Sequence, residues 1–194
     1  MQRFPPQNLR TTGPTPIPSD IVEAMTNPMI NHRGPEFDTL LNKATEQLKQ
    51  VFMTKNDLFI LTASGTGSLE ASIVNTLSPG DRVIAATAGA FGDRFVDMVE
   101  AYGADVKRMD FEWGGPIESD DIRKVLQAEP NIKAVLVTHN ETSTGVTHPV
   151  EDIAKVVQGE FDNRLLADAV TSLGCIPLPV HPAASDLVRP APHT

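Results

Sequence analysis

Short apolar segments alternate with longer amphipathic segments along most of the chain. Five short segments are typical of β-strands, and the segments between them place apolar residues at helical spacing. The predicted strands are residues 58–61, 82–86, 105–109, 132–137 and 164–167. The predicted helices are residues 68–77, 93–102, 119–128 and 150–157. Because no hairpin signal joins consecutive strands, we predict an α/β fold with a mostly parallel sheet covered by helices.

The first part of the chain has a different pattern. Five prolines within residues 1–18 forbid a continuous helix or a central strand, so we predict an N-terminal arm there. Ser19-Asp20 predicts the N-cap of a short helix that runs through Met25. A second, amphipathic helix is predicted from Pro35, which suits the first helical position, to about Met53.

Charge and cysteine content exclude several classes of protein. A net charge of −9 over 194 residues disfavours binding to the phosphate backbone of nucleic acids. The single cysteine, Cys175, excludes an internal disulfide framework and fits a reducing cytoplasm. No apolar run approaches the ~18 residues of a membrane span, and the first residues contain no apolar signal core. We expect a soluble, cytoplasmic protein that binds neither nucleic acid nor membrane.

A glycine-rich stretch connects the first predicted strand to the helix after it. Residues 62–71 read Thr-Ala-Ser-Gly-Thr-Gly-Ser-Leu-Glu-Ala. The glycines allow a close approach to the backbone, and the hydroxyls of Ser64, Thr66 and Ser68 add donors to the N–H groups of a helix N-terminus. The stretch lacks the Gly-Lys-Ser/Thr ending of a nucleoside-triphosphate loop and the spacing of a dinucleotide fingerprint, so it fits a single phosphate. Taken alone, such a turn is more often an ordinary loop.

Other polar and aromatic residues follow the remaining predicted strands. Ligands of parallel sheets bind beyond the carboxyl ends of the strands. The residues at those ends are Ser64-Gly65-Thr66, 87–91, 138–144 and Asp168. These ends supply a turn suited to a phosphate, an aromatic side chain and a carboxylate directly after a buried strand. Together they fit pyridoxal 5′-phosphate (PLP), whose chemistry needs an acid that keeps its pyridine nitrogen protonated.

This interpretation gives each residue a role and leaves each an ordinary alternative. Asp168 would pair with the ring nitrogen, Phe91 would stack on the ring, and Thr142 could reach a ring substituent. Alternatively, Asp168 caps the next segment, Phe91 belongs to the core and Thr142 is a loop donor. Separately each alternative is favoured, but the occurrence of all three at consecutive strand ends favours the site.

The chain resembles the class V (fold type I) PLP-dependent aminotransferases, and most closely the branch of alanine–glyoxylate and serine–pyruvate aminotransferases. The resemblance covers about residue 10 to about residue 188, in the family's order and spacing. The matching motifs are Gly13-Pro14-Thr15-Pro16, His32-Arg33-Gly34-Pro35-Glu36-Phe37, Ser64-Gly65-Thr66-Gly67-Ser68-Leu69-Glu70-Ala71, Gly89-Ala90-Phe91-Gly92-Asp93-Arg94, Thr138-His139-Asn140-Glu141-Thr142-Ser143-Thr144-Gly145-Val146 and Asp168-Ala169-Val170-Thr171-Ser172-Leu173-Gly174.

The resemblance implies a set of site residues and partners. The implied cofactor contacts are Ser64, Gly65 and Thr66 at the phosphate, Phe91 stacked on the ring, Thr142 near it, Asp168 at the pyridine nitrogen and Val170 on the ring's other side. Gly13 resembles the loop near the substrate carboxylate. An intact member is expected to be a homodimer that acts on an amino acid and a 2-oxo acid.

The sequence departs from the family where the chemistry needs a lysine. The Schiff-base lysine of the family stands in a Ser-x-Lys motif one strand after Asp168. Here the expected position, about 194, is Thr194, and the last lysine is Lys155, on a predicted exposed helix before Asp168. We also expect the small C-terminal domain of the family to be absent. We therefore expect residues 19–188 to form a partial PLP-binding large domain, residues 189–194 to be a divergent tail, and this truncated chain to be inactive as a transaminase.

Three other interpretations remain. The chain could be a non-catalytic remnant that binds PLP weakly or acts only as an interaction protein. Another fold type I activity, such as a cysteine desulfurase or a lyase, is disfavoured because those relatives usually carry histidine where Phe91 stands. A phosphate-binding module unrelated to PLP would not explain Asp168 and Phe91 together.

Overall fold

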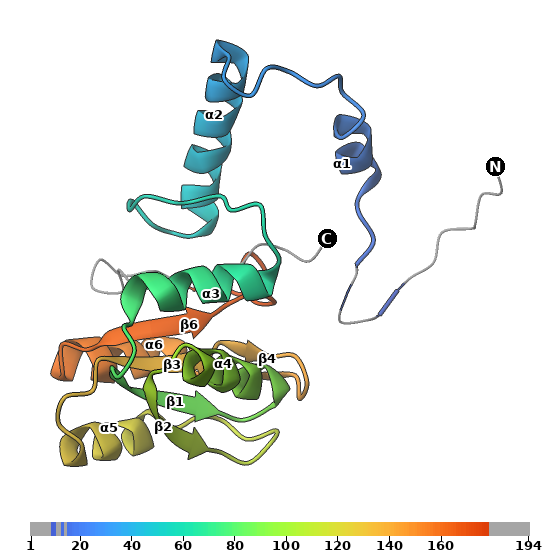
Figure 1. Ribbon diagram of the computed structural model, residues 1–194. Coiled ribbons are helices and arrows are strands. Elements are labelled where there is room, and N and C mark those ends of the chain that lie inside the picture. Colours follow the sequence, from blue (N-terminus) through green and yellow to red (C-terminus); the bar gives the residue numbers. More distant parts are fainter. Residues whose placement is uncertain (1–8, 11–12, 14, 179–194) are drawn as a thin grey trace.

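A four-stranded parallel sheet is the centre of the computed structural model, which describes residues 9–10, 13 and 15–178 (Figure 1). Its strands follow the order β2-β1-β3-β6. They are β1 (Arg82–Thr87), β2 (Asp105–Asp110), β3 (Ala134–Thr138) and β6 (Arg164–Asp168). All three neighbouring pairs are parallel, which confirms the predicted fold class and four of the five predicted strands.

Helices cover both faces of this sheet (Figure 1). On β3, Leu136 packs with α3 and α4, whereas Val135 and Val137 pack on the opposite side with α5, α6 and η1. These elements are α3 (Gly65–Thr76), α4 (Ala90–Ala101), α5 (Ser119–Ala128), α6 (Val150–Ala154) and the π-helix η1 (Lys155–Glu160). Because β1 and β3 are apolar on both faces, they are fully suited to the middle of a parallel sheet.

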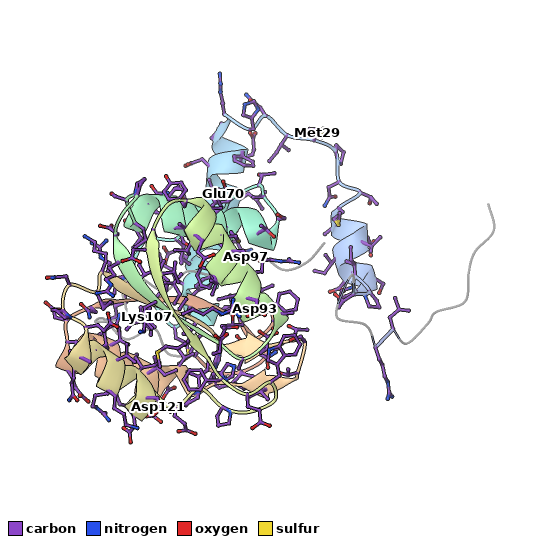
Figure 2. All side chains as sticks on the ribbon, turned by 60° about the horizontal axis from the view of Figure 1, so that its bottom comes forward. Met29, Glu70, Asp93, Asp97, Lys107 and Asp121 are labelled. Carbon is purple, nitrogen blue, oxygen red and sulfur yellow. The ribbon has the colours of Figure 1, made fainter. Side chains whose placement is uncertain are left out.

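The edge strand β2 is polar, unlike the buried strands. Only Val106 and Met109 are half-buried in it, and the other residues are exposed. Lys107, which Figure 2 labels, pairs with Glu129 at 3.1 Å. Arg82 of β1 also pairs with Glu129, at 2.6 Å. Charges on an edge strand disfavour pairing with a foreign strand.

The predicted strand at residues 58–61 is wrong. These residues form no strand, and the Phe59 side chain is 86% exposed. A strand needs a partner for its backbone hydrogen bonds, and within the described part of the chain no strand pairs with this segment. The apolar run alone therefore did not determine its conformation.

Two helices precede this segment, α1 (Ser19–Ala24) and α2 (Pro35–Val51). Pro35 opens α2 as predicted, but the predicted Ser19-Asp20 cap is wrong, because Pro18 is the N-cap of α1 and no side chain caps it. Neither helix buries a residue, and Met29 between them is 99% exposed (Figure 2). The predicted apolar face of α2 therefore has no cover in the described part of the chain.

Several boundaries also differ from the prediction. The helix α3 begins at Gly65, three residues early, because Ser64 caps it, and α4 begins at Ala90. The segment between β3 and α6, where no strand was predicted, contains a small antiparallel hairpin of β4 (Asn140–Glu141) and β5 (Val146–Thr147). Its turn uses Gly145, which has a φ of 80°. The predicted tail, residues 189–194, and most of the predicted arm lie outside the described residues.

Among the described residues, no helix combines the length and apolar character needed to span a bilayer.

Candidate functional site

A hollow opens where the carboxyl ends of the strands meet the N-termini of α3 and α4. The space between its walls, counted together with open solvent, is about 430 Å³, of which about 30 Å³ admits the centre of a water molecule. Its lining residues are Gly65, Thr66, Leu69, Phe91, Arg94, Asn140, Thr142, Asp168, Val170 and Thr171. Six of the eight predicted site residues therefore lie together, while Ser64 and Gly13 are not part of this lining.

The N-terminus of α3 forms one wall. Ser64 acts as its N-cap, because its Oγ accepts a hydrogen bond from the Gly67 N–H at 3.3 Å and its carbonyl oxygen accepts one from the Ser68 N–H at 3.1 Å. The N–H groups of a first helical turn have no intrahelical acceptor, so this end of α3 suits an anion. The structure thus places Gly65 and Thr66 at the hollow and gives Ser64 the supporting position.

Asp168 lies at the floor of the hollow. It is the last residue of β6 and only 4% exposed. Its Oδ1 accepts a hydrogen bond from the Val170 N–H at 2.9 Å, and its carbonyl oxygen accepts one from the His139 N–H at 2.7 Å. A carboxylate in this environment is best stabilised by a cationic or donor partner.

A hydroxyl and amide cluster forms the wall next to Asp168. Thr142 Oγ1 donates to Thr171 Oγ1 at 3.2 Å, Asn140 Nδ2 donates to the same oxygen at 3.1 Å, and Thr171 Oγ1 donates to the Asn140 carbonyl oxygen at 3.2 Å. Thr171 and Asn140 had no predicted role, although both belong to motifs that resemble the family. The position of Thr171 three residues after Asp168 was the available signal.

Phe91 forms the aromatic wall, on the first turn of α4. Its ring is half-buried, and the Arg94 guanidinium carbon lies 5.5 Å from the ring centroid, within range of a cation–π contact. Arg94 was also not assigned a role, although its spacing of three residues from Phe91 on a helix places both on one face. It adds a positive charge to the same lining as Asp168.

His148 is a buried titratable group outside the hollow. It is 2% exposed, its Nδ1 accepts a hydrogen bond from the Ile117 N–H at 3.2 Å, and its Nε2 has no hydrogen-bond partner among the described residues. Burial lowers the pKa of His148 from its ordinary value of 6.5, although Glu141 nearby acts in the opposite direction.

This shift gives the stability of the fold a pH dependence. Because the folded pKa lies below 6.5, the unfolded chain binds more protons as the pH falls through that value, so stability decreases there. The variant His148→Asn keeps an acceptor for Ile117 but does not titrate, and we expect a flatter profile of stability against pH. Urea unfolding on both sides of pH 6.5 measures this. His32→Asn, at an exposed histidine, is the control, and an equal flattening in both variants would contradict the assignment.

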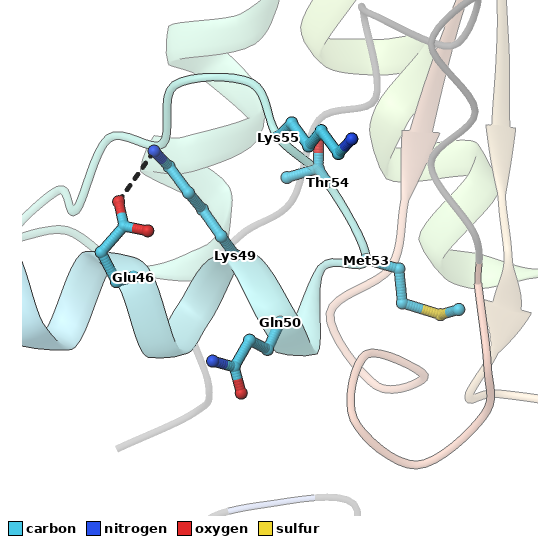
Figure 3. A pocket seen from close by; sticks show the side chains of 6 residues that line it. All are labelled: Glu46, Lys49, Gln50, Met53, Thr54 and Lys55. Carbon is cyan, nitrogen blue, oxygen red and sulfur yellow. Dashed lines mark hydrogen bonds and ion pairs between the residues drawn. The ribbon is translucent and has the colours of Figure 1, made fainter.

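A second depression lies at the C-terminal end of α2 (Figure 3). Its lining comes from one continuous segment and consists of Glu46, Lys49, Gln50, Met53, Thr54 and Lys55. Glu46 and Lys49 pair with each other at 2.9 Å, and none of these residues is buried. The depression therefore offers no buried polar group that would bind a ligand.

Comparison with known proteins gives concordant results. The family model described as Aminotransferase class-V matches residues 8–193. An uncharacterized aminotransferase of Methanocaldococcus jannaschii is 41% identical over 166 residues, which are 86% of this chain and 43% of the relative. A serine–glyoxylate aminotransferase of Methylorubrum extorquens is 39% identical over 180 residues, 90% of this chain and 45% of the relative.

Solved structures agree with the sequence comparison. The crystal structure of an alanine–glyoxylate aminotransferase from Nostoc matches with a TM-score of 0.83 and 32% identity, over 93% of this chain and 50% of that one. The chain spans about half the length of the curated relatives that it matches. Because the family model covers nearly the whole chain, the chain belongs to the class-V aminotransferase family.

Proposed function

We propose that the hollow binds pyridoxal 5′-phosphate. The observation that carries the proposal is the convergence of an anion-binding helix end, an aromatic ring and a buried carboxylate in one lining. These groups fit the phosphate, the ring and the ring nitrogen of this cofactor, respectively. Membership of the class-V aminotransferase family supports the same cofactor.

Each residue of the lining has a chemical task in this proposal. The first-turn N–H groups of α3 and the Thr66 hydroxyl bind the phosphate. Phe91 and Val170 enclose the ring, Thr142 binds a ring substituent, and Asp168 holds a proton on the pyridine nitrogen. Bound PLP supplies an electron sink for the bond that breaks at the substrate carbon. Asp168 keeps that sink effective because its negative charge favours the protonated ring nitrogen.

The proposed reaction of the whole protein is transfer of an amino group from an amino acid to a 2-oxo acid. Relatives that are named serine–glyoxylate and alanine–glyoxylate aminotransferases support alanine or serine as donor and glyoxylate as acceptor. Pyruvate as an alternative acceptor follows from the sequence resemblance. A cytoplasmic homodimer is the form that we propose for it. Residues 19–188 would then be part of its large domain.

A second candidate is reversible, non-covalent binding of PLP by the chain without transamination. No lysine is among the described residues that line the hollow, and Lys155 instead pairs with Asp152 at 2.6 Å on an exposed helical surface. In this candidate the described lining of the hollow would bind the cofactor, and it includes no lysine that would attach it covalently.

Titration with PLP and with pyridoxal, which lacks the phosphate, tests the proposal. We expect PLP to bind more tightly than pyridoxal, and Thr66→Val to lower PLP affinity by about tenfold through loss of one charge-assisted hydrogen bond. Pyridoxal affinity should be the same in the variant and the unaltered chain. Calorimetry or the absorbance of the bound cofactor measures both ligands.

Thr76→Val, at the opposite end of the same helix, is the matched control and should bind both ligands as the unaltered chain does. Equal affinities for PLP and pyridoxal would remove α3 from the phosphate site. Borohydride reduction of the PLP complex separates the two candidates, since a specific adduct at one lysine would exclude purely non-covalent binding.

A further inference from the structure

The N-terminus of α4 is capped by a side chain from a distant part of the sequence. Its own N-cap, Gly89, has no side chain to do so. The Glu141 carboxylate accepts hydrogen bonds from the Phe91 N–H, at 3.3 Å to Oε1 and 3.2 Å to Oε2, and from the Gly92 N–H at 3.0 Å. Glu141 is 1% exposed, so this is a buried contact between the β4–β5 hairpin and α4.

Ser143 completes the contact. Its N–H and its hydroxyl donate to Glu141 Oε1 at 3.1 and 2.6 Å, and its Oγ accepts a hydrogen bond from the Ala90 N–H at 3.1 Å. Glu141 and Ser143 thus bind the first three N–H groups of α4. An acidic acceptor at a helix N-terminus is also favoured by the helix dipole.

The close approach depends on glycine at position 89. A Cβ there would lie 2.5 Å from both Cγ and Cδ of Glu141 and 2.6 Å from Ser143 Oγ. Those distances are far inside van der Waals contact, so any side chain at position 89 would displace the carboxylate.

The donors of this contact need both carboxylate oxygens of Glu141. Four donors converge on the two oxygens of Glu141, from Phe91, Gly92 and twice from Ser143. A glutamine has one acceptor oxygen, and its NH₂ group would face backbone N–H groups. The uncharged variant Glu141→Gln therefore loses acceptors without losing volume.

The position of Glu141 in the chain connects two walls of the hollow. Thr142 lies between Glu141 and Ser143 in sequence, and Phe91 contributes one of the N–H groups that the carboxylate binds. Both Thr142 and Phe91 line the hollow, whereas Glu141 does not. The buried Glu141 carboxylate, which is not part of the lining, thus connects Phe91 in the aromatic wall to Thr142 in the hydroxyl wall.

We propose that Glu141 is a positioning residue, whose carboxylate fixes the Phe91 ring and the Thr142 hydroxyl at the separation that the bound pyridine ring requires. This inference rests on the proposed function of the hollow. A carboxylate that only caps a helix would affect the stability of α4 and leave cofactor binding unchanged. The two roles therefore differ in a measurable way.

The test compares Glu141→Gln with Asp81→Asn. Asp81 Oδ2 accepts a hydrogen bond from the Ser78 N–H at 2.9 Å in the turn before β1, at the amino ends of the strands. Asp81→Asn therefore removes a charge remote from the hollow and keeps one acceptor oxygen, as Glu141→Gln does. PLP affinity, the induced circular dichroism of bound PLP and amide hydrogen exchange at residues 90–92 are measured for both variants and the unaltered chain.

We expect Glu141→Gln to accelerate exchange at residues 90–92, to lower PLP affinity about tenfold and to reduce the induced dichroism per bound PLP. Asp81→Asn should leave all three unchanged. Should Glu141→Gln fail to fold, Ser143→Ala removes the Ala90 acceptor and one donor to Glu141, and the same direction of change is expected.

Two results overturn the inference in distinguishable ways. If the unaltered chain binds no PLP, the proposed function of the hollow fails and the role of Glu141 fails with it. If the unaltered chain binds PLP and Glu141→Gln only accelerates exchange, with the same affinity and dichroism as Asp81→Asn, the hollow is the cofactor site but Glu141 is merely a helix cap.

Discussion

Replacement of Asp168 by alanine is expected to weaken PLP binding by about 10- to 100-fold, the range of a hydrogen bond to a charged partner. The Asp168 carboxylate is buried at the end of β6 and lines the hollow beside Thr171 and Val170. Without it, a protonated ring nitrogen would be buried without a counter-charge, so the cofactor would bind weakly or bind with an unprotonated ring. Titration followed by the absorbance of bound cofactor measures both affinity and ring protonation.

Two further variants separate charge from shape. Asp168→Asn keeps the size and an acceptor for the Val170 N–H but has no charge, and we expect it to lose most of the affinity as well. Asp110→Ala changes the corresponding last residue of β2, whose side chain is 67% exposed, and should bind PLP normally. Full affinity and an unchanged spectrum in Asp168→Asn would remove the charge of Asp168 from the proposed role.

Replacement of Phe95 by alanine is expected to lower the free energy of unfolding by about 3–5 kcal/mol, the usual cost of truncating a buried phenylalanine. Phe95 is 2% exposed and belongs to the cluster of α3, α4 and sheet residues that includes Leu69 and Leu136. Because it anchors α4 to the sheet one turn after Phe91, its loss should also reduce PLP affinity. Urea unfolding measures the stability change.

Phe59→Ala is the matched control, since its ring is 86% exposed. Truncation of an exposed side chain changes stability by no more than about 0.5 kcal/mol. A comparable loss of stability in both variants would mean that residues 57–61 are packed in solution, contrary to their exposure here.

The strands were predictable where burial alone decides their conformation. The segments at β1 and β3 are apolar on both faces and lie in the middle of the sheet. Residues 58–61 have an equally apolar pattern, but a strand also needs a neighbour, and periodicity along one segment carries no information about pairing. The β4–β5 hairpin was missed for a related reason, because two-residue strands have no period to detect.

Much of the candidate site was predictable because the topology of a parallel sheet brings its carboxyl ends to one edge. Phe91, Thr142, Asp168 and Val170 follow strands of the sheet and line one hollow. Gly65 and Thr66 join the same lining from the N-terminus of α3, although the strand predicted before them is not formed. Their roles toward a cofactor remain predictions, and Gly13 does not join the lining. Arg94, Thr171 and Glu141 were not identified, since their contributions depend on side-chain direction and on hydrogen bonds between distant segments.

The exposed apolar run at residues 58–61 affects the attraction between separate molecules of this chain. Phe59, Ile60 and Leu61 are exposed on a chain that carries a net charge of −9. At low ionic strength the mutual repulsion of such chains opposes contact between their apolar segments. Salt shortens the range of that repulsion to about 8 Å at physiological ionic strength and does not weaken the attraction between apolar surfaces. Attraction between exposed apolar side chains, of which this segment is one group, is therefore opposed by the charge of the whole molecule.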